Sequence, residues 1–276
     1  MRRPAPDGGR DLGEHAQAWA AWQATPWGRL RYRVVRETLD RTVDALLEAG
    51  HGPRLRVLDA GGGDASDSVP LAVAGHDVVV LDPSEVLLEQ ARRRAAQAGT
   101  TLRCHRAGVG DLDPSGADPV DLGSFDLVLC HHVVQYLPSS AEAVDALAPL
   151  LRPGGRLSLM SVNPAARVMA TAVRLGDLPA ALAQLDTPTM HAATFATTVR
   201  AVEPEDGERA LTSAGLVLER SYGVLALTTL IADDGRKQDP SFFADLEALE
   251  LALCDREPYR RTAAMWQRVA RRPAHP

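Results

Sequence analysis

Apolar runs alternate with amphipathic segments from about Leu30 to Leu157. The segment Arg31–Glu48 places aliphatic side chains on one helical stripe, namely Val34, Val35, Leu39, Val43, Leu46 and Leu47. Buried strands are predicted at "RLRVLDA", "DVVVLD", "TLRCHRA", "FDLVLCHH" and "RLSLMSV", and helices at "VPLAVAG", "PSEVLLEQARRRAAQAG" and "SAEAVDALAPLLRPGG". Strands that alternate with helices indicate a parallel sheet covered on both faces. We therefore predict an α/β fold with a doubly wound, mostly parallel sheet.

The alternation weakens at residues 163–200, after the fifth predicted strand. "PAARVMATAVRLGDLPAALAQL" predicts two short helices and "DTPTMHAATFATTV" a loop, so we expect an insertion or lid here. Periodicity then returns with a helix at Pro204–Ala214, a strand at Leu216–Val224, a helix at Phe242–Cys254 and a strand near Ala264–Ala270. We expect residues 1–13 to be a disordered leader, 14–52 a helical lid and 53–276 the main domain.

Composition narrows the class of protein. The chain has 276 residues, no apolar run of the roughly 20 residues that span a bilayer, and no apolar core behind its first arginines, so neither a membrane span nor a signal peptide is expected. Its three cysteines, Cys104, Cys130 and Cys254, lack CxxC spacing, which predicts no metal site and fits a cytoplasmic protein. The net charge of −6 does not favour nucleic acid, although Arg29–Arg36 and Tyr259–Arg272 are locally basic.

The stretch "VLDAGGG" carries the first chemical signal. A dinucleotide fingerprint read from Gly61 would place Ser66 where the third glycine is needed, and no phosphate-binding G-x-x-x-x-G-K-[ST] motif occurs. Asp59, two residues before the glycines, disfavours phosphate but can hold an amino group. The cofactor with an amine and no phosphate is S-adenosylmethionine.

A second acid extends this predicted cofactor site. Asp82, followed by Pro83, ends the next strand about 20 residues further on, where an acid accepts hydrogen bonds from ribose hydroxyls. Gly61, Gly62 and Gly63 would form the turn between the two acids. Either acid could instead cap the helix that follows it.

Four motifs at these spacings carry a family resemblance. "VLDAGGG", "VVVLDPS", "FDLVLCHHVVQYL" and "LLRPGGRLSLM" resemble the class I S-adenosylmethionine-dependent methyltransferases over about Arg54–Val162. The resemblance implies a seven-stranded, Rossmann-like methyltransferase sheet with an N-terminal helical lid. Ala65 departs from it, because the family commonly has a third glycine there. We expect its methyl group to be tolerated if the backbone stays near helical.

A closer resemblance extends over nearly the whole chain. "GRLRYRVVRETLDR", "SLMSVNP" and "CDREPYRRTAAMWQRVARRP" are similar to the bacterial tRNA 5-carboxymethoxyuridine methyltransferases, which esterify the carboxylate of a wobble uridine. This resemblance implies roles for six positions. Arg31 would pair with the cofactor carboxylate, Gly61 and Gly62 line its methionine arm, Asp82 take the ribose, Val109 lie near adenine and His131 lie beside the cofactor. The lysine run of those relatives is replaced here by "AQLDTPTMHAATFATT".

Further candidate residues depend on the acceptor. A carboxylate acceptor needs no general base, whereas a hydroxyl or an amine could use His131, His132 or Tyr136. His131 and His132 end a buried strand, so one of them could instead be a satisfied core histidine. Asp111 either orients the adenine amine or caps a turn.

Three tryptophans near the N-terminus, Trp19, Trp22 and Trp27, either fill a core or stack on a base. Near-helical spacing of this kind is more often a core feature. They are therefore not included in the predicted site.

Three functions remain in view. The first is methyl transfer to an oxygen or nitrogen of a small-molecule acceptor, which the acidic balance and the missing lysine run favour. The second is carboxyl methylation of the tRNA wobble base, which would make tRNA the partner. The third is a non-catalytic cofactor-binding protein. An NAD oxidoreductase is disfavoured because the third glycine of its fingerprint is missing.

Overall fold

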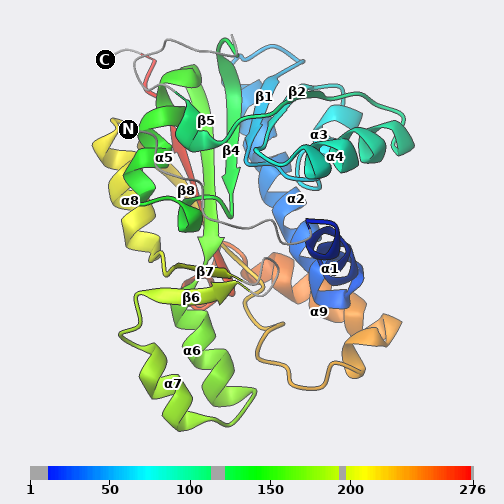
Figure 1. Ribbon diagram of the computed structural model, residues 1–276, viewed down its shortest axis with the longest axis vertical. Helices are drawn as coiled ribbons and strands as arrows, with labels where there is room; N and C mark the ends of the chain where they lie inside the picture. Colours follow the sequence, from blue (N-terminus) through cyan, green and yellow to red (C-terminus); the bar gives the residue numbers. More distant parts are fainter. Residues whose placement is uncertain (1–11, 113–121, 193–196, 275–276) are drawn as a thin grey trace.

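Seven strands form one sheet in the computed structural model, which describes residues 12–112, 122–192 and 197–274 (Figure 1). The strand order is β3-β2-β1-β4-β5-β9-β8. The strands are β1 (Arg56–Ala60), β2 (Asp77–Leu81), β3 (Arg103–His105), β4 (Phe125–His131), β5 (Leu151–Val162), β8 (Val217–Val224) and β9 (Met265–Arg271). The first five strands along the chain pair in parallel, and β9 runs antiparallel to both β5 and β8. The predicted doubly wound, mostly parallel, seven-stranded sheet is confirmed.

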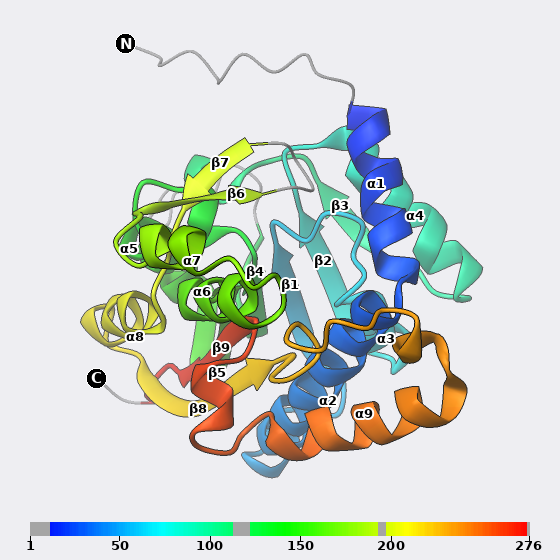
Figure 2. The ribbon, with the colours of Figure 1, turned by 90° about the horizontal axis from the view of Figure 1, so that it is seen from below.

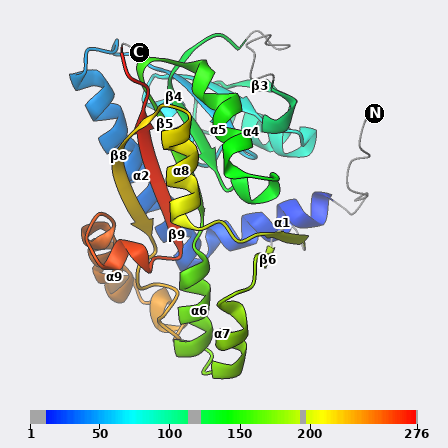
Figure 3. The ribbon, with the colours of Figure 1, turned by 90° about the vertical axis from the view of Figure 1, so that its left-hand side faces the viewer.

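Helices cover both faces of this sheet (Figure 3). They are α2 (Pro26–Glu48), α3 (Val69–Val73), α4 (Glu85–Gln97), α5 (Ser140–Leu147), α8 (Pro204–Ser213) and α9 (Pro240–Leu253). The core of one face takes side chains from α2, α3, α4 and α9, and the core of the other from α5 and α8. The stripe predicted on α2 is buried except for Leu47, which is 38% exposed at the end of the helix.

Helix α1 and the start of α2 lie at the carboxyl edge of the parallel strands, and the rest of α2 packs on one face of the sheet. Helix α1 (Leu12–Ala24) begins two residues before the predicted lid and contacts α4 and α2 (Figure 2). Helix α2 starts at Pro26, five residues earlier than the hydrophobic stripe indicated, because Thr25 caps it and proline suits a first helical turn. Residues 1–11 of the predicted leader lie outside the described residues.

The insertion after β5 holds two helices, as predicted, and two strands that were not. Helices α6 (Pro164–Val173) and α7 (Leu178–Gln184) form a helical hairpin. β6 (Thr189–Ala192) and β7 (Thr197–Arg200) then pair antiparallel, where a loop was expected. Met190 and Val199 are cross-strand partners, and both side chains are buried. Their apolar contact helps to hold the two strands together. Strands of four residues are too short to show a periodicity.

Two boundaries also differ from prediction. Strand β5 begins at Leu151 and contains the Pro-Gly-Gly sequence that was predicted to end the preceding helical segment. Its pairing register with β4 shifts between Phe125 and Leu127, so this part of the strand is irregular. Helix α4 begins at Glu85 with Ser84 as its cap, which leaves Pro83 outside the helix. No helix among the described residues is long and apolar enough to cross a membrane.

Candidate active site at the carboxyl edge of the sheet

A cavity of about 520 Å³ opens at the carboxyl ends of β1, β2 and β4. The strand order reverses direction between β1 and β4, which is where ligands bind in open α/β sheets. The cavity wall is completed by α1 and α2 on one side, and by the ends of β5 and β9 together with β6 on the other. The doubly wound topology thus brings residues distant in sequence to one pocket.

The glycine turn after β1 lets the backbone pass closely between two side chains. Gly61 has φ = +72°, and a Cβ atom there would lie 2.3 Å from Cγ2 of Val133. At Gly62 a Cβ would lie 2.5 Å from the carboxyl carbon of Asp59. Ala65 has φ = +59°, so the near-helical backbone on which the expected tolerance of its methyl group depended is not present. An L-residue in this region carries a strain of about 1–2 kcal/mol.

Asp59 is a buried acid next to the hydroxyl of Ser68, and within the described part of the chain one of its two carboxylate oxygens is unpartnered. It is 3% exposed, and among the described residues its Oδ2 atom has no hydrogen-bond partner. Burial is the main cause that raises the pKa of Asp59 to about 7, and the neighbouring Asp67 and Asp82 add to the effect. Ser68, not Asp59, occupies the cap position of α3. A buried acceptor of this kind is poised to take a donor from a ligand.

Asp82 joins the glycine turn to the start of α4. Its Oδ2 accepts a hydrogen bond from the backbone N–H of Gly63 (2.9 Å), and its Oδ1 accepts one from Ser84 (2.8 Å). Burial raises the pKa of Asp82 despite these two bonds. The cap of α4 is Ser84, so the alternative in which Asp82 caps the helix is not observed. Two lone pairs of the carboxylate remain for a ligand.

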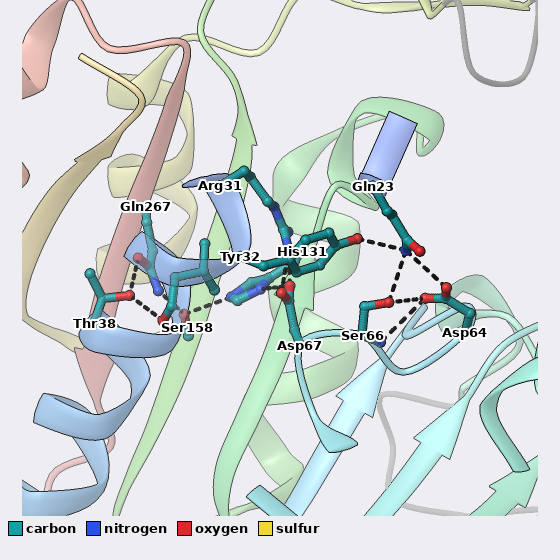
Figure 4. Close-up of polar contacts among 11 residues, drawn as sticks. Gln23, Arg31, Tyr32, Thr38, Asp64, Ser66, Asp67, His131, Ser158 and Gln267 are labelled. Carbon is teal, nitrogen blue, oxygen red and sulfur yellow. Dashed lines mark hydrogen bonds and ion pairs between the residues drawn. The ribbon is translucent and has the colours of Figure 1, made fainter. Parts of the chain in front are cut away.

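Arg31 and His131 meet on a third acid, Asp67 (Figure 4). Both terminal nitrogens of the Arg31 guanidinium donate to the Asp67 carboxylate, the Nη2–Oδ2 distance being 2.8 Å. Nδ1 of His131 lies 2.8 Å from Oδ2 of the same carboxylate. Burial alone would raise the pKa of Asp67, but the Arg31 charge and His131 together hold it below its usual range.

The contacts continue from His131 into the sheet and return to α2 (Figure 4). Nε2 of His131 lies 2.9 Å from Oγ of Ser158, which accepts a hydrogen bond from Nε2 of Gln267 at 2.9 Å. Oγ1 of Thr38 then donates to Oε1 of Gln267 at 2.8 Å. Because the ionised Asp67 can only accept, Nδ1 of His131 carries the proton and Nε2 accepts from Ser158. Both ring nitrogens of His131 are therefore engaged away from a reacting group.

The remaining wall of the cavity is largely aromatic. Trp19 and Trp22 of α1 both line it and stack on each other, with ring centroids 5.0 Å apart and 9° between their planes. His132 and Tyr136 follow β4 on the opposite side. Burial and the positive charge of Arg31 lower the pKa of His132 to about 3. His132 is consequently a neutral and weakly basic imidazole at pH 7.

Comparisons with known proteins agree with this geometry. A family model described as "Methyltransferase domain" matches residues 58–157. The tRNA 5-carboxymethoxyuridine methyltransferase of Escherichia coli K12 is 33% identical over 142 residues, which cover 50% of this chain and 51% of that protein. An uncharacterised protein of Mycobacterium tuberculosis is 32% identical over 147 residues, 52% of each chain. The chain spans about half the length of the curated relatives it matches.

Solved structures show the same fold. The magnesium protoporphyrin IX methyltransferase of Synechocystis PCC 6803 superposes with a TM-score of 0.51 at 19% identity, over 96% of this chain and 89% of that one. An S-adenosylmethionine-dependent methyltransferase from Mesorhizobium loti superposes with a TM-score of 0.53 at 22% identity, over 84% and 96%. The chain carries a class I methyltransferase domain.

The methyltransferase domain gathers nearly all of the predicted site residues around one cavity. Those that line it are Arg31, Asp59, Gly61, Gly62, Gly63, Asp82, Pro83, Val109, His131, His132 and Tyr136. Asp111 does not line it, and instead accepts a hydrogen bond from the backbone N–H of Gly108 at 2.8 Å, which is the turn-capping alternative. Among the described residues no group of three or more His, Cys, Asp or Glu side chains could hold a metal ion.

Sequence reasoning missed Asp67 and underrated two tryptophans. Asp67 lies four residues after the last glycine of the turn, and the acid-rich sequence "GGGDASD" was the available signal. Trp19 and Trp22 line the cavity, although their spacing suggested a core. Trp27 instead lies beside Lys237, with Nζ of the lysine 5.4 Å from the centroid of the tryptophan ring. Helical spacing identifies a common face but not what that face covers.

Proposed function

We propose that this protein is an S-adenosylmethionine-dependent methyltransferase that acts on a small-molecule acceptor. The observation that carries the proposal is the buried Asp59, whose unpartnered Oδ2 lies beside a glycine turn in a pocket at the switch point of the sheet. An acid in this position suits the amino group of the cofactor and disfavours a pyrophosphate.

The other residues of the pocket fit the remaining groups of this cofactor. Asp82 has carboxylate lone pairs left for ribose hydroxyls, and the small Gly61 and Gly62 leave room for a ligand against the backbone. Val109, 3% exposed, offers an apolar contact for adenine. Arg31 lines the pocket, and its guanidinium would interact with both Asp67 and the carboxylate of the cofactor.

The bound cofactor would supply a methyl group already activated on a sulfonium. The protein's part is then to position the two reactants and to exclude water, more than to move protons. His131 has both ring nitrogens engaged, and the pKa of His132 is about 3. Burial also raises the pKa of Tyr136, so its phenol stays protonated at pH 7. We therefore favour an acceptor that is already unprotonated at neutral pH, such as a carboxylate.

A tRNA wobble carboxylate is the second candidate, and the 33% identity to the Escherichia coli tRNA enzyme favours it. Binding to tRNA requires arginine or lysine side chains that are available to phosphates. In both arginine-rich segments most arginines instead contact acids of this chain. These ion pairs are Arg31–Asp67, Arg33–Glu247, Arg36–Asp40, Arg260–Glu257, Arg261–Glu257, Arg268–Glu208 and Arg271–Glu219. The two basic segments thus offer little uncompensated charge, which favours the small-molecule acceptor.

Methyl transfer from radiolabelled cofactor tests both candidates in one experiment. The protein is incubated with S-adenosylmethionine labelled in its methyl group, and with either bulk tRNA or a panel of small carboxylic acids, phenols and amines. We expect cofactor binding without competition by NADH, and label in an acid as a base-labile ester. Asp82→Ala, which removes ribose hydrogen bonds of roughly 1.5–3 kcal/mol in total, should bind about 10- to 100-fold more weakly. Tight NADH binding without any response to S-adenosylmethionine would overturn the proposal, and label in tRNA would establish the second candidate.

A further inference from the structure

The helical hairpin α6–α7 exposes an apolar face. Its five large aliphatic side chains, Val173, Leu175, Leu178, Leu182 and Leu185, are 62–70% exposed, which makes them the most exposed large apolar side chains among the described residues. Elsewhere in the described chain the highest value for such a side chain is 56%. In Figures 1 and 3 the hairpin projects beyond the sheet, away from the rest of the molecule.

Three of these side chains form one stripe on α7, and the other two lie where α6 ends and in the connection to α7. Leu178, Leu182 and Leu185 are spaced i, i+4, i+7, so they lie along a single stripe of α7 and its last turn. The opposite side of the hairpin already has its partners: Ala181 is buried and Thr171 donates a hydrogen bond to Gln184 at 3.1 Å. The leucine stripe is therefore not needed for the packing of α7 on α6.

The hairpin is also held in place on the domain. Arg174, at the end of α6, donates to the carbonyl of Ile231 at 2.8 Å and pairs with Asp234 at 2.5 Å. Arg167 donates to the carbonyl of Thr189 at 3.2 Å, which joins α6 to β6. These contacts fix the position of the leucine stripe relative to the rest of the domain.

We propose that this face, Val173 to Leu185, is the interface of a symmetric homodimer. Five aliphatic side chains that are each more than 60% exposed are comparable to the largest apolar patch of a typical monomer, about 300–600 Å². Two such patches together approach the roughly 1,200 Å² at the lower end of specific interfaces. No charged residue occurs between Leu178 and Leu185, and the two charged residues earlier in the face are engaged, Arg174 with Asp234 and Asp177 with the backbone of α7. Two identical stripes therefore meet without like-charge repulsion. An uncharged stripe lacks the basic residues of helices that bind anionic membranes, and a two-fold pairing is the commonest way for one patch to cover itself.

Sedimentation velocity of the full chain over a concentration series tests the proposal. We expect a monomer–dimer equilibrium that does not weaken in 1 M salt, because its contacts are apolar. Leu182→Arg should weaken dimerisation at least tenfold, since a two-fold axis brings two copies of the charge together. Leu249→Arg, on α9, is the matched control, since Leu249 is 44% exposed outside the face, and it should leave the dimer unchanged. Circular dichroism of both variants checks that they are folded.

Cross-linking supplies a measurement that does not depend on weakening the dimer. Leu182 is the centre of the stripe, so Leu182→Cys should form an intermolecular disulfide on mild oxidation, while Leu249→Cys should not. A parent protein that stays monomeric at all concentrations would overturn the proposal. The same holds for a monomer whose apolar face binds neutral lipid vesicles. A dimer that tolerates Leu182→Arg and gives no cross-link at this position would also overturn it.

Discussion

Replacing Asp59 by asparagine should stabilise the fold while weakening cofactor binding. Asp59 is 3% exposed, its Oδ2 has no partner among the described residues, and its pKa is raised to about 7. An unfolded chain holds the same group at about 3.9. Asn keeps the shape of the side chain and removes its ionisation, so the substitution isolates the effect of the charge.

The sign of the effect follows from the direction of the shift. An acid with a raised pKa in the folded state destabilises the fold by an amount that grows with pH between its unfolded and folded pKa values and stays constant above the folded value. This penalty is absent below about pH 4, grows between pH 4 and pH 7, and is constant above pH 7. The difference between a pKa of about 3.9 in the unfolded chain and about 7 in the folded chain corresponds to about 4 kcal/mol of unfolding free energy. Any difference in packing between the amide and the neutral carboxyl displaces the whole curve, so the pH-dependent part reports the charge alone.

Urea unfolding of both proteins between pH 4 and pH 8 measures this difference. We expect the free energy of unfolding of Asp59→Asn to rise relative to the parent by a few kcal/mol across that range. Equal pH dependence in the two proteins would show that Asp59 does not titrate abnormally. Asp59 would then be ionised throughout this range, and the pH dependence expected for cofactor binding would be absent.

Cofactor binding provides the functional half of the same prediction. The cofactor amine requires an ionised Asp59, so below pH 7 its affinity should fall up to tenfold per pH unit, with release of about one proton. Asp59→Asn should remove this component and weaken binding by about 10- to 100-fold, the value of a charged hydrogen bond. Calorimetry in two buffers of different ionisation enthalpy measures both quantities. Titration of the cofactor's own amine is common to both proteins and cancels.

Three further predictions concern the segment after β1 and helix α2. Asp67→Asn should destabilise the fold by about 3–5 kcal/mol, because it leaves a buried guanidinium without its counter-charge, whereas the surface substitution Asp40→Asn should cost at most about 1 kcal/mol; urea unfolding compares them. The contribution of Asp67 should be lost as the pH falls below about 4, since its pKa is lowered in the folded state. Gly61→Ala combines a positive φ with a Cβ contact of 2.3 Å, so calorimetry should find cofactor binding abolished or the melting temperature lowered. Arg31→Lys should weaken cofactor binding, whereas Arg33→Lys, 40% exposed, should bind like the parent; equal affinities would make Arg31 a purely structural residue.

The parts of the site that could be predicted are those set by local sequence. Asp59 and Asp82 each end a strand whose apolar run is visible in the sequence, and parallel strands bring such ends to one edge. Asp67 could not be placed this way, because its partners Arg31 and His131 are 36 and 64 residues away. Only the packing of α2 across the sheet decides that they meet.

The left-handed turn residues show a second limit of prediction. At Ala65 an alanine occupies a conformation, φ = +59°, that favours glycine, and no local rule indicates this. His132, directly after β4, has the same φ of +59°. Both residues border the cavity region, where strain is maintained by the surrounding packing. Leu225, the third described non-glycine residue with positive φ, does not line the cavity, so left-handed backbone is not confined to the site.

The polar contacts of α2 connect the stability of this helix to the electrostatics of the pocket. They leave the helix at Arg31, pass through Asp67 and His131 into the sheet, and return to the same helix at Thr38, two turns further on. A buried network of this kind is favourable only when each member keeps its partner. Arg31, which lines the cavity, is oriented by Asp67, and Asp67 is in turn held by His131. We infer that His131 contributes to the site by holding Asp67, and through it Arg31, and not by accepting a proton.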